Sequence, residues 1–390
     1  MRISLIGTRG VPARYGGFET CVEEVGRRLV RRGHEITVYC RDGVRGTGEH
    51  LGMRLVRRPA LRRKTLETLS HTALSMLHAA GRRPDVAVVF NSANAPLLPL
   101  LRMRGIPVIT HVDGLEWKRA KWGPAGSAYY RRAEALAVRW SDALIADARG
   151  IQDYYRDRFG VATDYIPYGA PVLGGIGSDG IAGLGLRPRA YHLVVARFEP
   201  ENHVHLAIEG HLRSNARYPL VVVGSAPYAN EYTARINRLA RRDPKIRLLG
   251  GIWDQRLLDQ LYGNALTYVH GHSVGGTNPS LLRAMGAAAP TSAYDVRFNR
   301  EVLGSFGRYF TDADGLAALC DAAEADPLAA LLRGQEQVGS LDRYTWDGVA
   351  EQYEQLAARV LSASRRRSAR PAWKPADLGP VVAPKTEELP

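Results

Sequence analysis

Short apolar runs rich in valine and isoleucine alternate with longer amphipathic segments in this sequence, and the alternation occurs twice along the chain. In the segment 19–32, apolar side chains recur every three or four residues, which is typical of a helix with one buried face. Short β-branched runs between such helices are typical of βαβ units, which build parallel sheets covered by helices. The pattern therefore predicts an α/β protein with two Rossmann-like, doubly wound domains.

The positions of these runs predict the elements and the domain boundaries. In the first series, strands are expected at 3–7, 36–39, 86–90, 108–111 and 143–146, and helices at 19–32, 64–80 and 129–140. In the second series, strands are expected at 193–196, 220–223, 246–249, 266–270 and 291–294, and helices at 204–211, 231–241, 255–262 and 279–286. We expect a first domain at 1–175, a flexible glycine-rich linker at 176–189, a second domain at 190–345, a helix at 346–361 that crosses back to the first domain, and a disordered tail at 362–390.

Several other protein classes do not fit the sequence. No apolar run approaches the roughly 20 residues that span a bilayer, and the N-terminus lacks the apolar core of a signal peptide. We therefore expect a cytoplasmic protein. The three cysteines, Cys21, Cys40 and Cys320, are odd in number and far apart, so the sequence indicates neither a disulfide framework nor a cysteine metal site.

Positive charge is concentrated in the first half of the chain. Residues 1–185 hold 28 Lys and Arg against 17 Asp and Glu, which is +11 of the total net charge of +14. Arg54, Arg57, Arg58 and the basic run 62–64 precede the apolar stretch 66–77. This combination suits an anionic membrane surface or a phosphate-bearing partner, although a solvated basic face would read the same way. Nucleic acid is not expected, because no aromatic residues or recognition motif accompany the arginines.

Two loops that follow predicted strands carry residues suited to phosphate. In the loop 7–19, Gly16 and Gly17 precede a helix, so the backbone can approach a phosphate and present its N–H groups, although a tight strand-to-helix turn would use the same residues. In the loop 197–202, Arg197 follows a strand directly, and its guanidinium can hold a diphosphate through two bonds. The alternative for Arg197 is an ion pair with a nearby glutamate of the same loop.

The loop 270–280 carries a third and stronger signal. Asn278 can cap the helix that follows, Pro279 fits its first turn, and the hydroxyls of Thr277 and Ser280 lie beside its free N–H groups. This pattern predicts an anion site at a helix N-terminus. The histidines at 270 and 272 indicate no metal site, because no carboxylate or third histidine lies at a ligand spacing.

Five separated strings resemble one family of enzymes. They are GTRGVPARYGGFET at 7–20, HVDGLEWKRAKWG at 111–123, IADARGIQDYY at 145–155, VVARFEPEN at 194–202 and HGHSVGGTNPSLL at 270–282. Together they resemble the family 4 retaining glycosyltransferases of the two-domain GT-B fold, and within it the bacterial rhamnosyltransferase-like subgroup. The resemblance implies a nucleotide-sugar donor bound by the second domain, an acceptor bound by the first, and sugar transfer in the cleft between them.

The resemblance also implies roles for single residues. It implies catalytic roles for Asp113, His111 and Arg197, with Asp113 orienting or deprotonating the acceptor hydroxyl, although Asp113 could instead cap the segment 114–119. The residues expected to bind the donor are Gly16, Gly17, Arg197, Asn202, Gly276, Thr277, Asn278, Ser280 and Arg283. The residues expected on the acceptor side are Arg14, Tyr15, Glu19 and Glu116. No metal and no cofactor besides the nucleotide-sugar co-substrate is expected.

One departure from the family concerns its two glutamates spaced eight residues apart in the donor loop. Gly275 and Arg283 occupy those places. Because the second glutamate usually holds the nucleotide ribose in the family, Arg283 implies either another ribose site or a further phosphate contact. The substitutions also leave open an inactive relative that still binds nucleotide sugar.

These observations lead to a functional hypothesis with alternatives. We expect a retaining, metal-independent hexosyltransferase that moves a sugar, L-rhamnose from its dTDP form, to a saccharide or lipid-linked acceptor in cell-envelope or exopolysaccharide synthesis. A basic first domain would then rest on the inner face of the membrane as a peripheral protein. The alternatives are a nucleotide-sugar epimerase of the same fold and the inactive nucleotide-sugar or glycan-binding relative. A dehydrogenase fits less well, because the first loop lacks the dinucleotide fingerprint.

Overall fold

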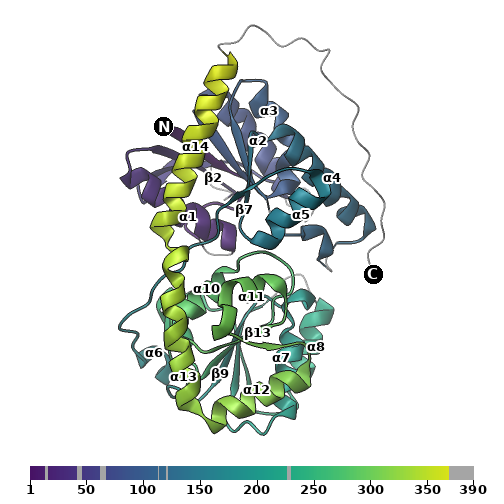
Figure 1. The fold of residues 1–390 in the computed structure, drawn as a ribbon, viewed down its shortest axis with the longest axis vertical. Coiled ribbons are helices and arrows are strands. Elements are labelled where there is room, and N and C mark those ends of the chain that lie inside the picture. The colour runs from purple at the N-terminus through teal and green to yellow at the C-terminus, as the bar shows by residue number, and fades with distance from the viewer. Residues whose placement is uncertain are drawn as a thin grey trace.

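Two α/β domains, one above the other, make up the computed structural model (Figure 1). The structure describes residues 1–13, 16–41, 46–61, 67–112, 114–119, 122–225 and 230–368. The strands of the first domain are β1 (Arg2–Ile6), β2 (Glu35–Cys40), β3 (Gly46–His50), β4 (Met53–Arg57), β5 (Val86–Phe90), β6 (Val108–His111), β7 (Ala143–Ala146) and β8 (Asp164–Tyr165). They form one sheet in the order β3-β4-β2-β1-β5-β6-β7-β8, in which only the β3–β4 pair is antiparallel.

Helices cover both faces of this sheet because its strands are apolar on both sides. The helices of the first domain are α1 (Gly17–Arg31), α2 (Glu67–Arg82), α3 (Pro99–Arg102), α4 (Pro124–Trp140) and α5 (Arg149–Phe159), with short 3₁₀ turns at Ser92–Leu97 and Glu116–Lys118. Leu5 of β1 packs on the α1 side with Val25. The adjacent Ile6 points to the opposite face and packs with Met76 of α2. The alternation follows from the two-residue repeat of a strand.

The second domain repeats the architecture with a fully parallel sheet. Its strands are β9 (His192–Val195), β10 (Leu220–Val223), β11 (Ile246–Gly250), β12 (Thr267–His270), β13 (Thr291–Tyr294) and β14 (Arg308–Phe310), in the order β11-β10-β9-β12-β13-β14. Its helices are α6 (Asp179–Gly183), α7 (Val204–Arg213), α8 (Asn230–Ala240), α9 (Gln255–Gly263), α10 (Pro279–Gly286), α11 (Arg297–Leu303), α12 (Ala313–Ala325) and α13 (Pro327–Glu336). Further 3₁₀ turns lie at Pro200–Asn202, Gly304–Phe306 and Gln337–Tyr344.

The strand order locates the crevice of each domain. β1 lies between β2 and β5, and β9 lies between β10 and β12. The chain therefore reverses its direction of winding at β1 and β5 in the first sheet, and at β9 and β12 in the second. Ligands of doubly wound sheets bind outside the carboxyl ends of strands at such a reversal. The loops after β1, β9 and β12 are the three that the sequence singled out for phosphate.

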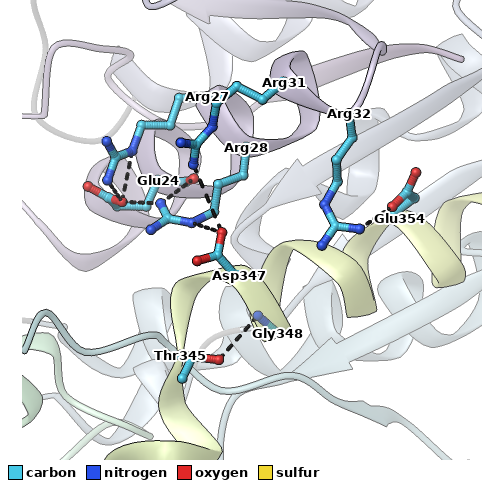
Figure 2. Close-up of polar contacts among 9 residues, drawn as sticks. All are labelled: Glu24, Arg27, Arg28, Arg31, Arg32, Thr345, Asp347, Gly348 and Glu354. Carbon is cyan, nitrogen blue, oxygen red and sulfur yellow. Dashed lines mark hydrogen bonds and ion pairs between the residues drawn. The ribbon is translucent and has the colours of Figure 1, made fainter.

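The last helix, α14 (Trp346–Ser368), leaves the second domain and lies along α1 of the first (Figure 1). Arg28 of α1 pairs with Asp347 at 2.9 Å, and Arg32 pairs with Glu354 at 2.9 Å (Figure 2). The two chain crossings between the domains lie side by side, because the Ala170 N–H donates to the Tyr344 carbonyl at 2.6 Å. The two connections between the domains are therefore hydrogen-bonded to each other.

The structure changes three expectations from the sequence. α14 extends to Ser368, so residues 362–368 belong to a helix and not to a disordered tail. The glycine-rich segment 176–189 contains α6, whose Ile181 is fully buried and whose Gly180 N–H donates to Gln260 of α9 at 2.7 Å. This segment is thus packed on the second domain instead of forming a free linker. Every expected strand is present, but four others were missed: β3 is polar, β8 and β14 are only two and three residues long, and β4 carries Arg54 and Arg57, which the sequence analysis assigned to a basic segment.

Candidate functional site

Three loops of the first domain touch the donor loop of the second, residues 270–280, through glycines. A methyl group on Gly114 would lie 2.5 Å from the Gly275 Cα, and one on Gly276 would lie 1.9 Å from Asp147 Oδ1. At the start of α1, a methyl group on Gly17 would lie 3.0 Å from Pro279. These contacts bring the carboxyl ends of β1, β6 and β7 against the loop after β12. The two domains therefore meet at the sheet edges where ligands bind.

Arg197 lies at the tip of β9 and remains accessible. Its side chain is 42% exposed, and Nη2 lies 3.4 Å from Glu199 Oε2. Asn202, which the resemblance placed on the donor, is buried, and its Nδ2 donates to the Arg197 carbonyl at 2.9 Å. Asn202 thus holds the loop that carries Arg197. The ion pair with Glu199 does not exclude a contact of Arg197 with a diphosphate, because this weak pair leaves most of the guanidinium available.

The start of α10 has the capping pattern that the sequence predicted. The side chain of Asn278 accepts from the Ser280 N–H at 2.9 Å and from the Ser280 hydroxyl at 2.7 Å. The Thr277 hydroxyl donates across the domain boundary to the Asp147 carbonyl. Both hydroxyls therefore stabilise the loop and the domain contact, while the helix N-terminus supplies the positive end of a dipole to the same loop.

Arg283 is engaged by a carboxylate of its own domain. Its Nε lies 2.6 Å from Asp259 Oδ1, and its Nη2 lies 3.2 Å from Asp259 Oδ2, a two-pronged ion pair between α10 and α9. The expected phosphate contact would have to compete with this pair. Asp259 carries no motif, so nothing in the sequence indicated the pairing.

The expected acceptor-side residues have different surroundings. Glu19 is buried and accepts from the Arg9 N–H at 3.0 Å, so it holds the loop after β1. Glu116 is buried, lies 2.5 Å from Arg119 Nε and accepts from Trp122 Nε1 at 3.3 Å. Arg14, Tyr15 and Asp113 lie outside the described residues.

His111, at the end of β6, is buried to 1% exposure. Burial lowers the pKa of its imidazole to about 3, so the ring is neutral at physiological pH. A neutral imidazole can donate or accept a hydrogen bond but carries no charge for a phosphate. No group of three or more His, Cys, Asp or Glu side chains suited to a metal occurs in the described parts of the chain.

A cluster of charged side chains links the two domains, and the sequence did not predict it. Arg119 of the first domain lies 3.3 Å from Glu199 and 3.5 Å from Glu201 of the second, and it also pairs with Glu116. Glu199 in turn pairs with Arg197. The strings at 111–123 and 194–202 contain these residues, but only the fold brings the two strings together. Arg119 therefore connects the first domain to the Arg197 loop.

Asp147 follows β7 and is buried against the donor loop, where Oδ1 has no hydrogen-bond partner among the described residues. Burial, with a smaller contribution from the charge of Glu301, raises the pKa of this carboxyl from 3.8 to about 8. The folded state therefore holds a proton that the unfolded chain releases near pH 4. The stability linked to this proton is complete below pH 4 and is lost as pH rises toward about 8.

Asp147→Asn replaces the neutral carboxyl with a neutral amide of the same shape. We expect the variant to exceed the wild type in free energy of unfolding by about 5 kcal/mol at pH 8 and to match it near pH 4, because at pH 8 only the wild type must take up a proton on folding. Chemical denaturation at pH 4, 6 and 8 measures the difference. Asp243→Asn, at an exposed turn, serves as control. A constant difference across pH would contradict the assignment.

Comparisons with known proteins agree with this architecture. Residues 16–169 match the sequence family described as a glycosyl transferase 4-like domain. No curated protein matches the chain by sequence.

Solved structures resemble the whole chain. Sucrose-phosphate synthase from Thermosynechococcus elongatus has a TM-score of 0.78 at 19% identity, over 93% of this chain and 99% of its own. HepE from Anabaena, in complex with UDP-glucose, has a TM-score of 0.73 at 15% identity, over 93% and 99%. A UDP-forming α,α-trehalose-phosphate synthase from Burkholderia vietnamiensis has a TM-score of 0.66 at 13% identity, again over 93% and 99%. The chain therefore has the GT-B fold, two parallel-sheet α/β domains arranged as in these glycosyltransferases, with a glycosyl transferase 4-like match in its first domain.

Proposed function

We propose that this protein is a glycosyltransferase that uses a nucleotide-sugar donor. The observation that carries the proposal is the position of Arg197, which is accessible at the tip of β9, where the second sheet reverses its winding. Its loop contacts the donor loop that leads into α10, because the Ser273 N–H donates to the Glu201 carbonyl at 2.9 Å. Two positive features at this point suit a diphosphate. The GT-B fold and the domain match at 16–169 support the same class of enzyme.

The reaction requires that negative charge on the departing diphosphate be stabilised. Arg197 and the dipole of α10 would do this with groups of the protein itself, so we propose transfer without an obligatory metal. We further propose retention of configuration, in which the acceptor hydroxyl attacks from the face that the diphosphate leaves, and the departing phosphate takes the proton. The neutral His111 then serves as a hydrogen-bond partner of a sugar or acceptor hydroxyl. The tight contact between the domains would exclude water from the reacting groups.

The sugar proposed is L-rhamnose from its dTDP form, transferred to a saccharide or lipid-linked acceptor of the cell envelope. The five strings that resemble the rhamnosyltransferase-like subgroup support this choice. UDP-glucose is the second candidate donor, because the solved structure of HepE holds it. The two candidates differ in both base and sugar, so a comparison of donors separates them.

The test is a screen of the purified protein against dTDP-rhamnose, UDP-glucose and GDP-mannose, with and without a metal chelator. Thermal shift reports binding, and release of nucleoside diphosphate reports turnover in the presence of saccharide and lipid-linked acceptors. Chelator-resistant turnover of dTDP-rhamnose alone supports the full proposal. Turnover of UDP-glucose instead would identify UDP-glucose as the donor and refute dTDP-rhamnose. Binding with no turnover favours the inactive relative, and release of epimerised nucleotide sugar favours the epimerase. No binding to any donor would overturn the site.

We also propose that the first domain rests on an anionic membrane through α2 and α3. None of the described helices is long and apolar enough to cross a membrane. Leu77 of α2 is 55% exposed and Met103, just after α3, is 74% exposed, and these two helices are in contact. Burial lowers the pKa of the His78 imidazole of α2, and the charges of the nearby Arg58, Arg82 and Arg54 lower it as well. Exposed apolar side chains beside arginines suit a surface of anionic lipids.

Leu77→Asp should weaken binding to vesicles that contain anionic phosphatidylglycerol by about tenfold, because it removes the apolar contact of Leu77 with the lipid and adds repulsion from the anionic head groups. Co-sedimentation with vesicles at low and high salt measures the effect. Leu328→Asp, at a similarly exposed leucine of the second domain, should leave binding unchanged. Equal losses in both variants, or wild-type protein that stays in the supernatant, would refute the membrane proposal.

A further inference from the structure

Three buried polar side chains from separate parts of the chain meet in the first domain, below its contact with the donor loop. They are Cys21 of α1, His111 at the end of β6 and Tyr353 of α14, each no more than 2% exposed. The Tyr353 hydroxyl lies 2.7 Å from His111 Nδ1 and 3.6 Å from Cys21 Sγ. α14 begins in the second domain, so this contact exists only because the last helix crosses back to the first.

Aromatic rings hold the imidazole of His111 in place. Phe18 meets it edge-on at 5.1 Å between ring centres, Phe90 lies at 5.5 Å, and Tyr168 stacks on it at 5.9 Å. The second ring nitrogen, Nε2, is buried and has no hydrogen-bond partner among the described residues. Phe18 adjoins Gly17, which faces Pro279 of the donor loop, so the ring lies just below the contact between the domains. Leaving a buried ring nitrogen without a hydrogen bond costs free energy, and a ligand bound at this place could supply the missing partner.

The direction of the hydrogen bonds follows from the protonation of the three groups. Burial raises the pKa of the Cys21 thiol to about 12 and that of the Tyr353 hydroxyl well above its usual value, so both keep their protons. Burial lowers the pKa of His111 to about 3, so its ring carries one proton. The thiol is a weak donor and its sulfur a weak acceptor, whereas Nδ1 is a strong acceptor at short range. The tyrosine O–H therefore donates to Nδ1, and the thiol S–H donates to the tyrosine oxygen.

We propose that Tyr353 is a positioning residue which, with Cys21, holds His111 as the tautomer protonated at Nε2, so that the imidazole presents an N–H donor to an oxygen of the sugar-bearing ligand. The tautomer follows because Nδ1 accepts from Tyr353 and the single proton of the neutral ring must then be on Nε2. The ligand part of this inference rests on the proposed glycosyltransferase function. The tautomer itself depends only on the contacts of the three side chains.

NMR of ¹⁵N-labelled histidine tests the tautomer without any assay of activity. His111→Ala assigns the signal by its loss. In the wild type we expect His111 as the Nε2–H tautomer, unchanged between pH 5 and 8. In Tyr353→Phe we expect a mixture of tautomers, because Nδ1 loses its donor, whereas Cys21→Ser keeps a donor and should keep the wild-type signal. An Nδ1–H signal in the wild type, or a pure Nε2–H signal in Tyr353→Phe, would overturn the proposal, and the wild-type spectrum decides even if a variant fails to fold.

Kinetics separate positioning from a structural role. We expect Tyr353→Phe to lower kcat about tenfold with the donor KM changed less than twofold, because the misplaced proton matters once the ligand is bound. The matched control is Tyr191→Phe, a fully buried tyrosine of the second domain whose hydroxyl donates to the Leu261 carbonyl at 2.6 Å. This control should lose one buried hydrogen bond and keep both kinetic constants. Equal losses of kcat in the two variants would refute the role of Tyr353. If the wild type turns over no donor while the tautomer is as expected, the glycosyltransferase function fails and the tautomer assignment stands.

Discussion

Arg197→Ala should lower kcat/KM for the donor by about 100-fold, because removing one preorganised group that stabilises developing charge costs about 3 kcal/mol. Most of the loss should appear in kcat, since the charge on the diphosphate grows as the sugar leaves. The stability of the fold should change little, because the side chain is 42% exposed and its ion pair to Glu199 is long. Steady-state kinetics with the donor identified by the screen measures the effect.

The matched control for this variant is Arg213→Ala. Arg213 lies at the end of α7 in the same domain, is 53% exposed and pairs with Asp314 at 2.9 Å, so its removal deletes an equivalent surface charge away from the cleft. Arg197→Lys should recover part of the activity, because an ammonium keeps the charge but not the two-pronged geometry. If Arg197→Ala retains more than half of the wild-type kcat/KM, Arg197 does not hold the diphosphate.

Gly276→Ala should force the two domains apart and lower turnover by about 100-fold or more, because positioning of donor against acceptor depends on their contact. The added methyl group would lie 1.9 Å from Asp147 Oδ1 and 2.8 Å from Ile151 Cδ1, and neither atom can be approached so closely. The backbone of Gly276 does not have a positive φ, so the effect is one of space rather than strain. Small-angle scattering should show a larger radius of gyration, while each domain keeps its secondary structure.

Two further variants separate this steric effect from a general loss of stability. Gly174→Ala adds a methyl group where no atom lies within 4 Å, so it should behave as the wild type. Asp147→Ala combined with Gly276→Ala removes the carboxyl that the methyl group meets, and it should recover part of the turnover and the compact radius. A compact and active Gly276→Ala variant would mean that this contact is not required.

Much of the fold could be predicted from the sequence because each strand is short, apolar and bounded by breakers. The runs at β5 and β10, for example, are wholly buried in the structure, and burial on both faces is what a continuous apolar run in a parallel sheet requires. β3 was missed because its sequence, GTGEH, has no apolar repeat and it forms only by pairing with β4. The glycine content of 176–189 predicts a free linker, but the segment contains the short helix α6. The burial of Ile181 against α9 outweighs the low helix propensity of that segment.

In the candidate site, local features could also be predicted from the sequence, and contacts between distant residues could not. The capping of α10 by Asn278 is local, so the sequence predicted it and the structure confirms it. The pairing of Arg283 with Asp259 and of Arg119 with Glu199 joins residues far apart along the chain or on different helices. No periodicity or spacing indicates such pairs. The same holds for Asp147, whose surroundings come from the other domain.

The sequence by itself determined that this chain forms two doubly wound α/β domains and that glycine-rich and arginine-bearing loops follow particular strands, whereas the strand order that puts these strands at the reversals came from the structure. These properties are local, since they depend on periodicity, propensity and residues a few positions apart. Only the tertiary structure buries Asp147 against the donor loop and brings Tyr353 into contact with His111, 242 positions away along the chain. Burial and long-range contact set the protonation of these groups, and neither is encoded in any short stretch of sequence.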